Sequence, residues 1–377
     1  MKNTVRKLLR SLYRALVRNQ LLAQPLLRLR STLRQLTRLR REPCTVFELA
    51  TANNFNETGY LAANPDVSQA VAAKKTGSAA EHLASAGSQE GRLQKSEVRL
   101  TRNERVMYAI KRDGAGLEIG PSFNPLMPKK KGFNVKSLDH ATREELVQKY
   151  AGHGVNISAI EEVDYVWRGE PLHELVGADR FDFVLASHVI EHSTDMIRFL
   201  QQLAAMLRPE GVISLIIPDK RYCFDYFRFP ASTGDILQAY AEARTRHPPG
   251  VIFDHMANVV TLGSACSWTH ERPGSLQLVH TLDEAVASFK HAGNTTEYLD
   301  AHCWRFTPAS FRLILNDLRA LGLIDLYEVA SFDTIGEEFF VSLRRSEGKV
   351  QKILPRGELM QAMMDEQAAV NRRMAQA

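Results

Sequence analysis

The pattern of apolar positions is most regular in the middle of the chain. Phe181 to Ala186 and Val212 to Ile217 are short apolar runs, as expected for parallel strands that are covered on both faces. Between them, apolar residues recur every three or four positions from Ile197 to Leu207, which is typical of an amphipathic helix with Ser193 or Thr194 as its cap. This order of strand, helix and strand predicts one unit of a parallel α/β sheet.

Similar patterns surround this unit over residues 99–345. Strands are predicted at residues 115–120, 133–138 and 160–163, a helix from Thr307 to Leu321, and a hairpin at residues 323–332 and 338–345. Together they predict the α/β class, with a doubly wound, mainly parallel sheet that ends in an antiparallel hairpin. Residues 220–306 do not fit the alternation, and we interpret them as an insertion that forms a substrate cap. Residues 346–377 have the composition of a polar, helical tail.

The amino-terminal residues 1–46 form a basic arm. Leucines recur every three or four positions from Leu8 to Leu36, arginines fill the other face, and Pro25 is expected to break or kink the segment. Such a helix suits an anionic membrane surface, although a helix that packs on a partner or on its own domain, or a disordered tail, fits the same pattern.

The positive charge of the chain is concentrated in this arm. Residues 1–42 contain 12 of the 48 basic residues and one of the 43 acidic ones, which leaves 36 basic and 42 acidic residues elsewhere. This mildly acidic remainder argues against broad nucleic-acid binding. Four widely spaced cysteines without a Cys-x-x-Cys pair, no run near 18 apolar residues and no secretory leader predict a cytoplasmic protein. With the arm, we expect it to be peripheral at the inner membrane.

Polar or turn-forming residues stand at the ends of the predicted strands. In chain order they are Glu118, Gly120, Pro121 and Ser122; Asp139 and His140; Asp164 and Tyr165; and Ser187 and His188. Because the carboxyl ends of parallel strands meet at one edge, where open α/β sheets bind ligands, we expect these residues to form one site. Asp139 follows the glycine turn by about 20 residues, a place suited to accept both hydroxyls of a ribose. The missing third glycine argues against a dinucleotide fingerprint and a dehydrogenase.

The central unit resembles class I S-adenosylmethionine-dependent methyltransferases, most closely those of type 11. The matching elements are Phe181-Asp182-Phe183-Val184, Glu191-His192, and Leu207-Arg208-Pro209-Glu210-Gly211 before a strand. Glu118 and Gly120 match the start of the first motif, whereas Ser122 and Asn124 stand where the family more often has glycines. The resemblance implies a Rossmann-like sheet and S-adenosyl-L-methionine as cofactor. It also implies that Asp164 reads the adenine amino group and that Ser187 and His188 lie near the methionine part.

Methyl transfer to a hydroxyl needs a base on the acceptor side. A histidine is suited to this role because its pKa lies near neutrality. The candidates are His188, His192, Asp219 and His302. No metal is expected, because the one conceivable set of ligands, Asp254, His255, Asp300 and His302, has an irregular spacing.

Residues 47–95 are predicted to be a separate, small helical module. They carry Tyr60-Leu61, Asn64-Pro65-Asp66-Val67, His82, Gly87 and Glu90-Gly91-Arg92 in a fixed order. This order is similar to that of a short module found beside bacterial glycosyltransferases and other cell-surface polysaccharide proteins. We expect the module to serve contacts, with its glycines and Pro65 forming turns and His82 packing in a small core.

These observations give one hypothesis and two alternatives. The hypothesis is methyl transfer to a hydroxyl of a surface glycan or glycolipid precursor, with glycosyltransferases and an anionic membrane surface as candidate partners. The first alternative is an inactive scaffold that keeps the fold in glycan assembly. The second is a methyltransferase that acts on a small molecule.

Overall fold

The computed structural model describes residues 40–269, 274–346 and 352–375. The helix expected in the basic arm falls on residues 1–39 and therefore lies outside the described residues. Within the described ranges, no helix is both long enough and apolar enough to cross a membrane.

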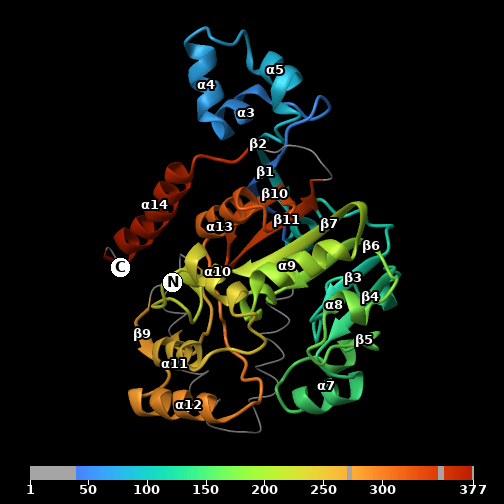
Figure 1. Ribbon diagram of the computed structural model, residues 1–377, viewed down its shortest axis with the longest axis vertical. Helices are drawn as coiled ribbons and strands as arrows, with labels where there is room; N and C mark the ends of the chain where they lie inside the picture. Colours follow the sequence, from blue (N-terminus) through green and yellow to red (C-terminus); the bar gives the residue numbers. More distant parts are fainter. Residues whose placement is uncertain (1–39, 270–273, 347–351, 376–377) are drawn as a thin grey trace, which may run out of the picture.

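A nine-stranded sheet runs through the molecule and has the strand order β2-β1-β10-β11-β7-β6-β3-β4-β5 (Figure 1). The strands are β1 Glu42–Leu49, β2 Leu93–Leu100, β3 Gly116–Ile119, β4 Val135–Asp139, β5 Tyr165–Val166, β6 Phe181–Ser187, β7 Leu207–Pro218, β10 Leu326–Ile335 and β11 Glu338–Arg345. Strands β3 to β7 pair in parallel, and β11 pairs antiparallel with both β7 and β10. The parallel block and the terminal hairpin are therefore as predicted. The sheet as a whole is mixed, because β1 and β2 add antiparallel pairings beyond the hairpin, so that four pairings are parallel and four antiparallel.

Helices cover both faces of the sheet, and β6 shows why its sequence is apolar throughout. Phe183 and Leu185 of β6 belong to one buried cluster, while the alternate residues Val184 and Ala186 belong to the other. One face is covered by α8 (Leu172–Leu175), α9 (Met196–Ala205), α10 (Thr233–Ala241) and α13 (Pro308–Ala320), and the other by α6 (Arg102–Val106) and neighbouring segments. A strand that is buried on both faces has no polar side, which removes the period of two.

Two local predictions in this region are wrong. Helix α9 is capped by Asp195, which accepts from the Arg198 amide at 3.0 Å, because Ser193 and Thr194 use their hydroxyls on the carbonyls of Ile190 and Arg244. The strand expected at residues 160–163 is displaced to β5. Ile160 instead packs with Leu146 of α7 (Arg143–Tyr150), in a small apolar cluster beside the sheet edge.

The amino-terminal unit is continuous with the main sheet. Its helices α3 (Glu57–Ala63), α4 (Pro65–Ala72), α5 (Ala79–His82) and the π-helical turn η1 (Leu83–Gly87) lie between β1 and β2. Strand β1 pairs with both β2 and β10, so the predicted boundary between residues 46 and 47 falls inside a strand. His82 packs as expected, since its Nδ1 lies 2.9 Å from the Tyr60 hydroxyl. A Cβ at Gly87 would lie 2.1 Å from that same hydroxyl oxygen, which explains the glycine.

The insertion after β7 leaves the sheet and returns to it. Its further elements are α11 (Pro249–Asn258), β8 (Val260–Leu262), β9 (Leu276–Leu278) and α12 (Leu282–Asn294). Strand β9 and helices α11 and α12 lie at the lower left of Figure 1, whereas α10 packs against α9 within the main core. At the return, Phe306 forms a parallel bridge with Asp219, and the Trp304 amide donates to the Glu191 carbonyl at 3.0 Å. The tail forms α14 (Arg356–Ala375), which lies beside α13.

Candidate active site

The turn after β3 has the backbone expected at a ligand-binding edge. Gly120 has a φ of +67° and Ser122 a φ of +45°, both in the left-handed region that most side chains disfavour. A Cβ at Gly120 would also lie 3.2 Å from Val189 Cγ2. Pro121 lies between these two residues. The glycine is thus required by both backbone angle and space.

Glu118 holds the loop that follows this turn. Its carboxylate is 3% exposed and accepts hydrogen bonds from the amides of Leu126 and Met127 at 2.7 and 3.1 Å. Burial raises the pKa of Glu118 to about 7, although the two amide hydrogen bonds act in the opposite direction. Glu118 was predicted to bind a cofactor, but both oxygens hold the backbone of its own loop.

Asp139 connects this turn to the end of β4. Its Oδ2 accepts from the Ser122 amide at 2.9 Å, and its Oδ1 accepts from the His140 amide at 2.8 Å and lies 2.6 Å from His140 Nδ1. Ser187 ends β6, which pairs with β3 on the other side. The structure therefore brings Gly120, Ser122, Asp139, His140 and Ser187 to the carboxyl ends of three adjacent strands, β4, β3 and β6.

Asp164 and Tyr165 are predicted to lie at this edge, but the structure places them elsewhere. Asp164 precedes β5, and its Oδ2 accepts from the Ser137 amide at 2.7 Å and pairs with the Lys129 ammonium group. Tyr165 donates its hydroxyl hydrogen to Asp179, which lies before the start of β6 and hence at the opposite ends of the strands. The residues at the end of β5 are Val166 and Trp167, because Val166 pairs with Asp139. The misplaced strand caused this error.

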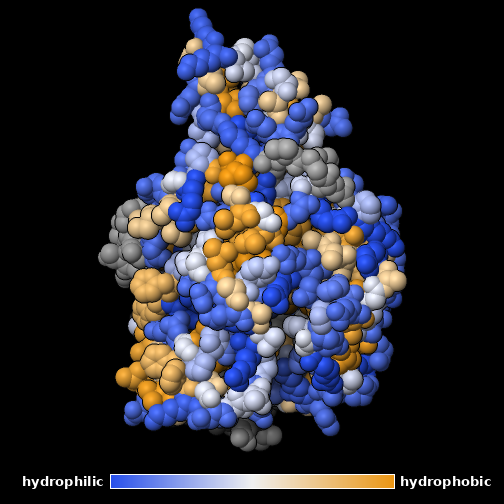
Figure 2. All heavy atoms as spheres, viewed as in Figure 1, coloured by the Kyte–Doolittle hydropathy of each residue, from blue (hydrophilic) through white to orange (hydrophobic). Residues whose placement is uncertain are grey.

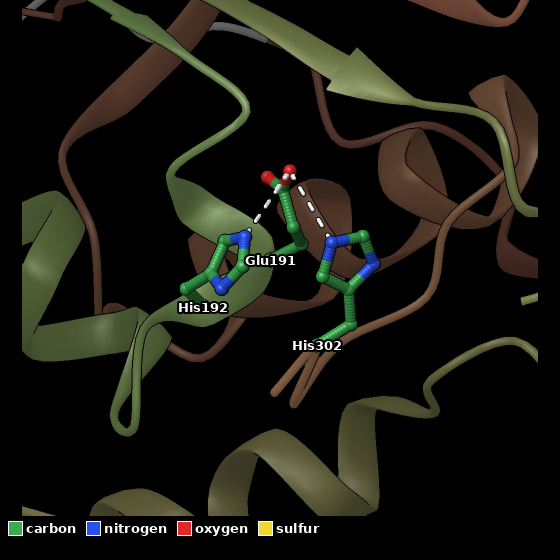
Figure 3. A group of neighbouring side chains, drawn as sticks. All are labelled: Glu191, His192 and His302. Carbon is green, nitrogen blue, oxygen red and sulfur yellow. Dashed lines mark ion pairs between the residues drawn. The ribbon is translucent and has the colours of Figure 1, made fainter. Parts of the chain in front are cut away.

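A second polar cluster lies just beyond β6. Glu191 belongs to the single turn η4 (Ile190–His192) and is 0% exposed. Neither of its carboxylate oxygens has a hydrogen-bond partner among the residues that the structure describes. Three imidazoles surround it: its Oε1 lies 3.7 Å from His188 Nδ1, 3.9 Å from His192 Nε2 and 4.0 Å from His302 Nε2. Figure 3 shows two of them, His192 and His302, on either side of Glu191.

Each of these imidazoles contacts another carboxylate through its second nitrogen. His188 Nε2 lies 3.0 Å from Glu338, His192 Nδ1 lies 2.8 Å from Asp300, and His302 Nδ1 lies 2.5 Å from Asp225. Two outer carboxylates are in turn held by arginines, Glu338 by Arg102 and Asp225 by Arg228.

Charge keeps these outer carboxylates ionised. Burial would raise the pKa of Asp225, but the hydrogen bond to His302 and the charge of Arg228 hold it well below its usual range. Burial would likewise raise the pKa of Glu338, yet Arg102 and His188 lower it strongly. An ionised carboxylate only accepts hydrogen bonds, so each imidazole must donate to it and turn its other nitrogen toward Glu191.

Neighbouring carboxylates in turn raise the pKa values of His188 and His192. Burial would lower the pKa of His188, but the hydrogen bond to Glu338 and the charge of Glu191 raise it above its ordinary value. For His192, burial is outweighed in the same way by Asp300 and Glu191. These imidazoles are thus able to hold a proton or another cation near neutral pH.

Three of the four predicted bases meet in this cluster, and the fourth does not. His188, His192 and His302 surround Glu191, although more than 100 positions separate His192 from His302. Asp219 is 0% exposed, and its oxygens accept from Arg221 at 2.5 to 3.1 Å and from Thr334. The prediction of Asp219 as a base is wrong, because this buried ion pair leaves no oxygen open to an acceptor.

Sequence reasoning assigned no direct role to Glu191 and none to Asp225. Glu191 was available from the spacing His188-x-x-Glu191-His192, which places three ligand-type side chains on one tight turn. No sequence pattern pointed to Asp225, because its carboxylate contacts His302 only once the insertion has folded. Of the conceivable metal set, Asp254 is instead bound to Arg228 at 2.9 Å. In the folded protein, ligand atoms of Glu191, His192 and His302 all lie within 4.8 Å of one another.

Comparisons with known proteins agree with this fold. A family model described as a methyltransferase domain matches residues 104–318, which is more than half of the chain. A curated relative, the ubiquinone biosynthesis O-methyltransferase of Rhodopseudomonas palustris strain TIE-1, is 43% identical over 51 residues, or 14% of this chain. The match covers only 19% of that relative's length.

Solved structures resemble the chain at low identity. The CcbJ methyltransferase from Streptomyces caelestis is 13% identical with a TM-score of 0.35, over 64% of this chain and 94% of that one. A DhpI-SAM-HEP complex is 13% identical with a TM-score of 0.32, over 77% of this chain and 100% of that one. With scores this low, neither structure bears on the substrate of this chain.

Proposed function

Because this chain belongs to the methyltransferase domain family, we propose that it transfers a methyl group to a hydroxyl of a glycan or glycolipid precursor. Its cofactor is S-adenosyl-L-methionine. The observation that carries the proposal is the adjacency of two groups of residues: Ser187 ends the cofactor edge of β6, and His188, the next residue, enters the histidine cluster.

The residues at the strand ends fit this cofactor. Gly120 allows close approach of the backbone, and Asp139 is the carboxylate at the end of the neighbouring strand β4, the place suited to a ribose. Asp139 is 2% exposed, and the roughly four lone-pair positions that a carboxylate offers are all in use, two by Ser122 and two by His140. In this proposal a ribose hydroxyl replaces the His140 imidazole at Oδ1, while Ser122 stays bound to Oδ2.

The histidine cluster supplies what a hydroxyl acceptor needs. When bound, the cofactor presents a methyl carbon on a positively charged sulfur, so the protein has chiefly to align an oxygen, exclude water and take up a proton. The side chain of His188 is 39% exposed and that of His192 is 30% exposed, whereas that of His302 is 8% exposed. We assign the contact with the acceptor to His188 and His192, and an orienting role to His302.

The exposed apolar surface of the insertion supports a precursor with a lipid part. Large apolar side chains of the insertion stand in water, and they include Phe229 at 85%, Leu278 at 60%, Leu282 at 66% and Phe289 at 44% exposure. Figure 2 shows apolar surface gathered over α11 and α12. Exposed apolar patches of this kind often mark ligand or membrane contacts. The resemblance of residues 47–95 to modules beside glycosyltransferases supports the glycan part, with those enzymes and an anionic membrane as the proposed partners.

Titration of the full chain with S-adenosylhomocysteine by calorimetry tests the cofactor part of this proposal. We expect binding to the wild type and at least tenfold weaker binding to Asp139→Ala. The control is Asp113→Ala, which removes an exposed carboxylate from the turn before β3 and should bind as the wild type does. A chain that binds no cofactor would instead be the inactive scaffold.

The acceptor part needs a separate assay. Purified chain is given S-adenosyl-L-methionine carrying a labelled methyl group, together with undecaprenyl-linked oligosaccharides or with water-soluble small hydroxyl compounds. Label on the lipid-linked fraction supports the proposal. Label on the soluble compounds alone contradicts it and favours a small-molecule methyltransferase.

A further inference from the structure

The buried carboxylate of Glu191 faces three imidazoles that lie close to it without donating a hydrogen bond. It is 0% exposed, and neither oxygen has a hydrogen-bond partner among the described residues. Leaving a carboxylate out of water without a hydrogen bond or a bound cation is strongly unfavourable. Its nearest polar neighbours lie at 3.7 to 4.0 Å, which is too long for hydrogen bonds. A single ion coordinated from both sides would fit between atoms at these separations.

The distances agree with a metal ion in that gap. Nitrogen and oxygen ligands lie about 2.1 Å from zinc, so two ligands at a tetrahedral angle lie about 3.4 Å from each other. The separations between Glu191 Oε1 and the nitrogens of His192 and His302 are 3.9 and 4.0 Å. A movement of a few tenths of an ångström for each side chain would complete the coordination.

The outer carboxylates give a second, independent indication. Histidines that bind metals donate their other ring hydrogen to a carboxylate or carbonyl, which fixes the tautomer and the ring orientation. All three imidazoles here have that partner: Glu338 for His188, Asp300 for His192 and Asp225 for His302. An arrangement meant only for proton transfer needs one such pair, whereas three pairs that converge on a fourth carboxylate are typical of a coordination shell.

The backbone at His188 adds a third indication. Its φ of +55° is uncommon for a residue other than glycine and is energetically unfavourable. This conformation at the end of β6 places the imidazole between Glu338 and Glu191. The contacts of the His188 imidazole with Glu338 and Glu191 thus compensate for the strain in its backbone.

We propose that Glu191, His192 and His302 bind a divalent transition-metal cation, with His188 beside the site. A ligand set of two imidazoles and one carboxylate suits Zn²⁺, Mn²⁺ or Fe²⁺, whereas Mg²⁺ and Ca²⁺ prefer oxygen ligands. The metal site replaces the expectation of a protein without metal, and it does not depend on the proposed function. Only the use of the metal depends on the proposed function. If the chain methylates a hydroxyl, an acceptor oxygen would join the ion on the partly exposed side of the site, at His188.

Metal binding to the full chain tests the site directly. The protein is stripped with a chelator and titrated with Zn²⁺ alone and with Mn²⁺ alone, by calorimetry and by elemental analysis after desalting. We expect one equivalent of metal per wild-type chain, and binding at least 100-fold weaker for Glu191→Gln and for His192→Ala. The control is His280→Ala, because His280 lies in the same insertion but faces Glu284 at 3.9 Å.

A second readout separates metal binding from misfolding and from cofactor binding. Added Zn²⁺ should raise the unfolding temperature of the wild type and of His280→Ala, and leave that of Glu191→Gln unchanged. Glu191→Gln should still bind S-adenosylhomocysteine as the wild type does. The proposal is overturned if the wild type takes up no metal, or if Glu191→Gln and His192→Ala bind it as tightly as the wild type. Either result would leave the cofactor titration intact, so the two proposals fail separately.

Discussion

The Asp139 carboxylate accepts a hydrogen bond of 2.9 Å from the Ser122 amide, across the gap between two strand ends. The turn after β3 and the acid after β4 are therefore one unit, although 17 positions separate them. The bond also holds Ser122 at its φ of +45°, where a serine would not stay by itself. Asp139 therefore compensates for the cost of this conformation.

Gly120→Ala should weaken cofactor binding more than it weakens the fold. The left-handed φ of +67° costs an alanine about 1 kcal/mol, and its Cβ would press on Val189 at 3.2 Å. Displacement of the turn from Asp139 should reduce the affinity for S-adenosylhomocysteine at least tenfold. The matched control is Gly132→Ala, with a φ of +87° and open space around it. Equal losses of affinity in both variants, measured by calorimetry, would contradict this placement of the turn.

Glu118 should make the protein less stable as the pH rises. Its pKa is about 7 in the folded protein against an ordinary value of 4.5, so the folded state binds a proton that the unfolded state releases. This contribution is complete below pH 4.5 and is lost as the pH rises through 7. The difference in unfolding free energy between the wild type and Glu118→Gln should therefore shift by about 3 kcal/mol from pH 4.5 to pH 8. Urea unfolding at several pH values measures this shift, and parallel curves for the two proteins would refute it.

Asp219→Ala should destabilise the fold without removing a base. The variant leaves Arg221, which is 7% exposed, without its main carboxylate partner. Breaking a buried ion pair from one side costs about 3 to 5 kcal/mol. The double variant Asp219→Leu with Arg221→Met should regain most of this loss, because it removes both charges. Urea unfolding measures both effects. A double variant that is stable yet has lost methyl transfer would return Asp219 to the list of catalytic candidates.

The elements that sequence reasoning placed correctly are those with a local signal. Short apolar runs predict strands β6 and β7, which are buried on both faces. Apolar residues at every third or fourth position predict the helix between them, which is buried on one face. The helix after the insertion follows from Thr307, whose side chain accepts from the Ser310 amide at 3.2 Å as a cap should. The two residues of β5 carry no such signal. Their place is fixed by pairing with Leu138 and Asp139, which only the fold reveals.

The candidate site divides in the same way. Gly120, Asp139 and Ser187 were predictable because each stands at the end of a recognisable strand. The prediction for Asp164 is wrong because its position was inferred from a strand that was itself misplaced. The histidines could be named from the sequence, but their common centre at Glu191 could not. It requires His302 to return from an insertion that ends more than 100 positions later.

Removal of the amino-terminal unit should expose an adhesive edge of the sheet. Strand β1 pairs antiparallel with β10 through Val46 and Phe332, and both residues belong to the same buried cluster. A chain that begins at residue 101 would leave the edge of β10 that faces β1 unpaired, while its other edge stays paired with β11. Unpaired edges promote aggregation. We expect this chain to form oligomers and to unfold at a lower temperature than a matched chain that begins at residue 40 and keeps β1. Size-exclusion chromatography and thermal unfolding measure the difference. A monomeric short chain with unchanged unfolding would mean that residues 40–100 are an independent module, so that their contribution to the acceptor could be tested by simple deletion.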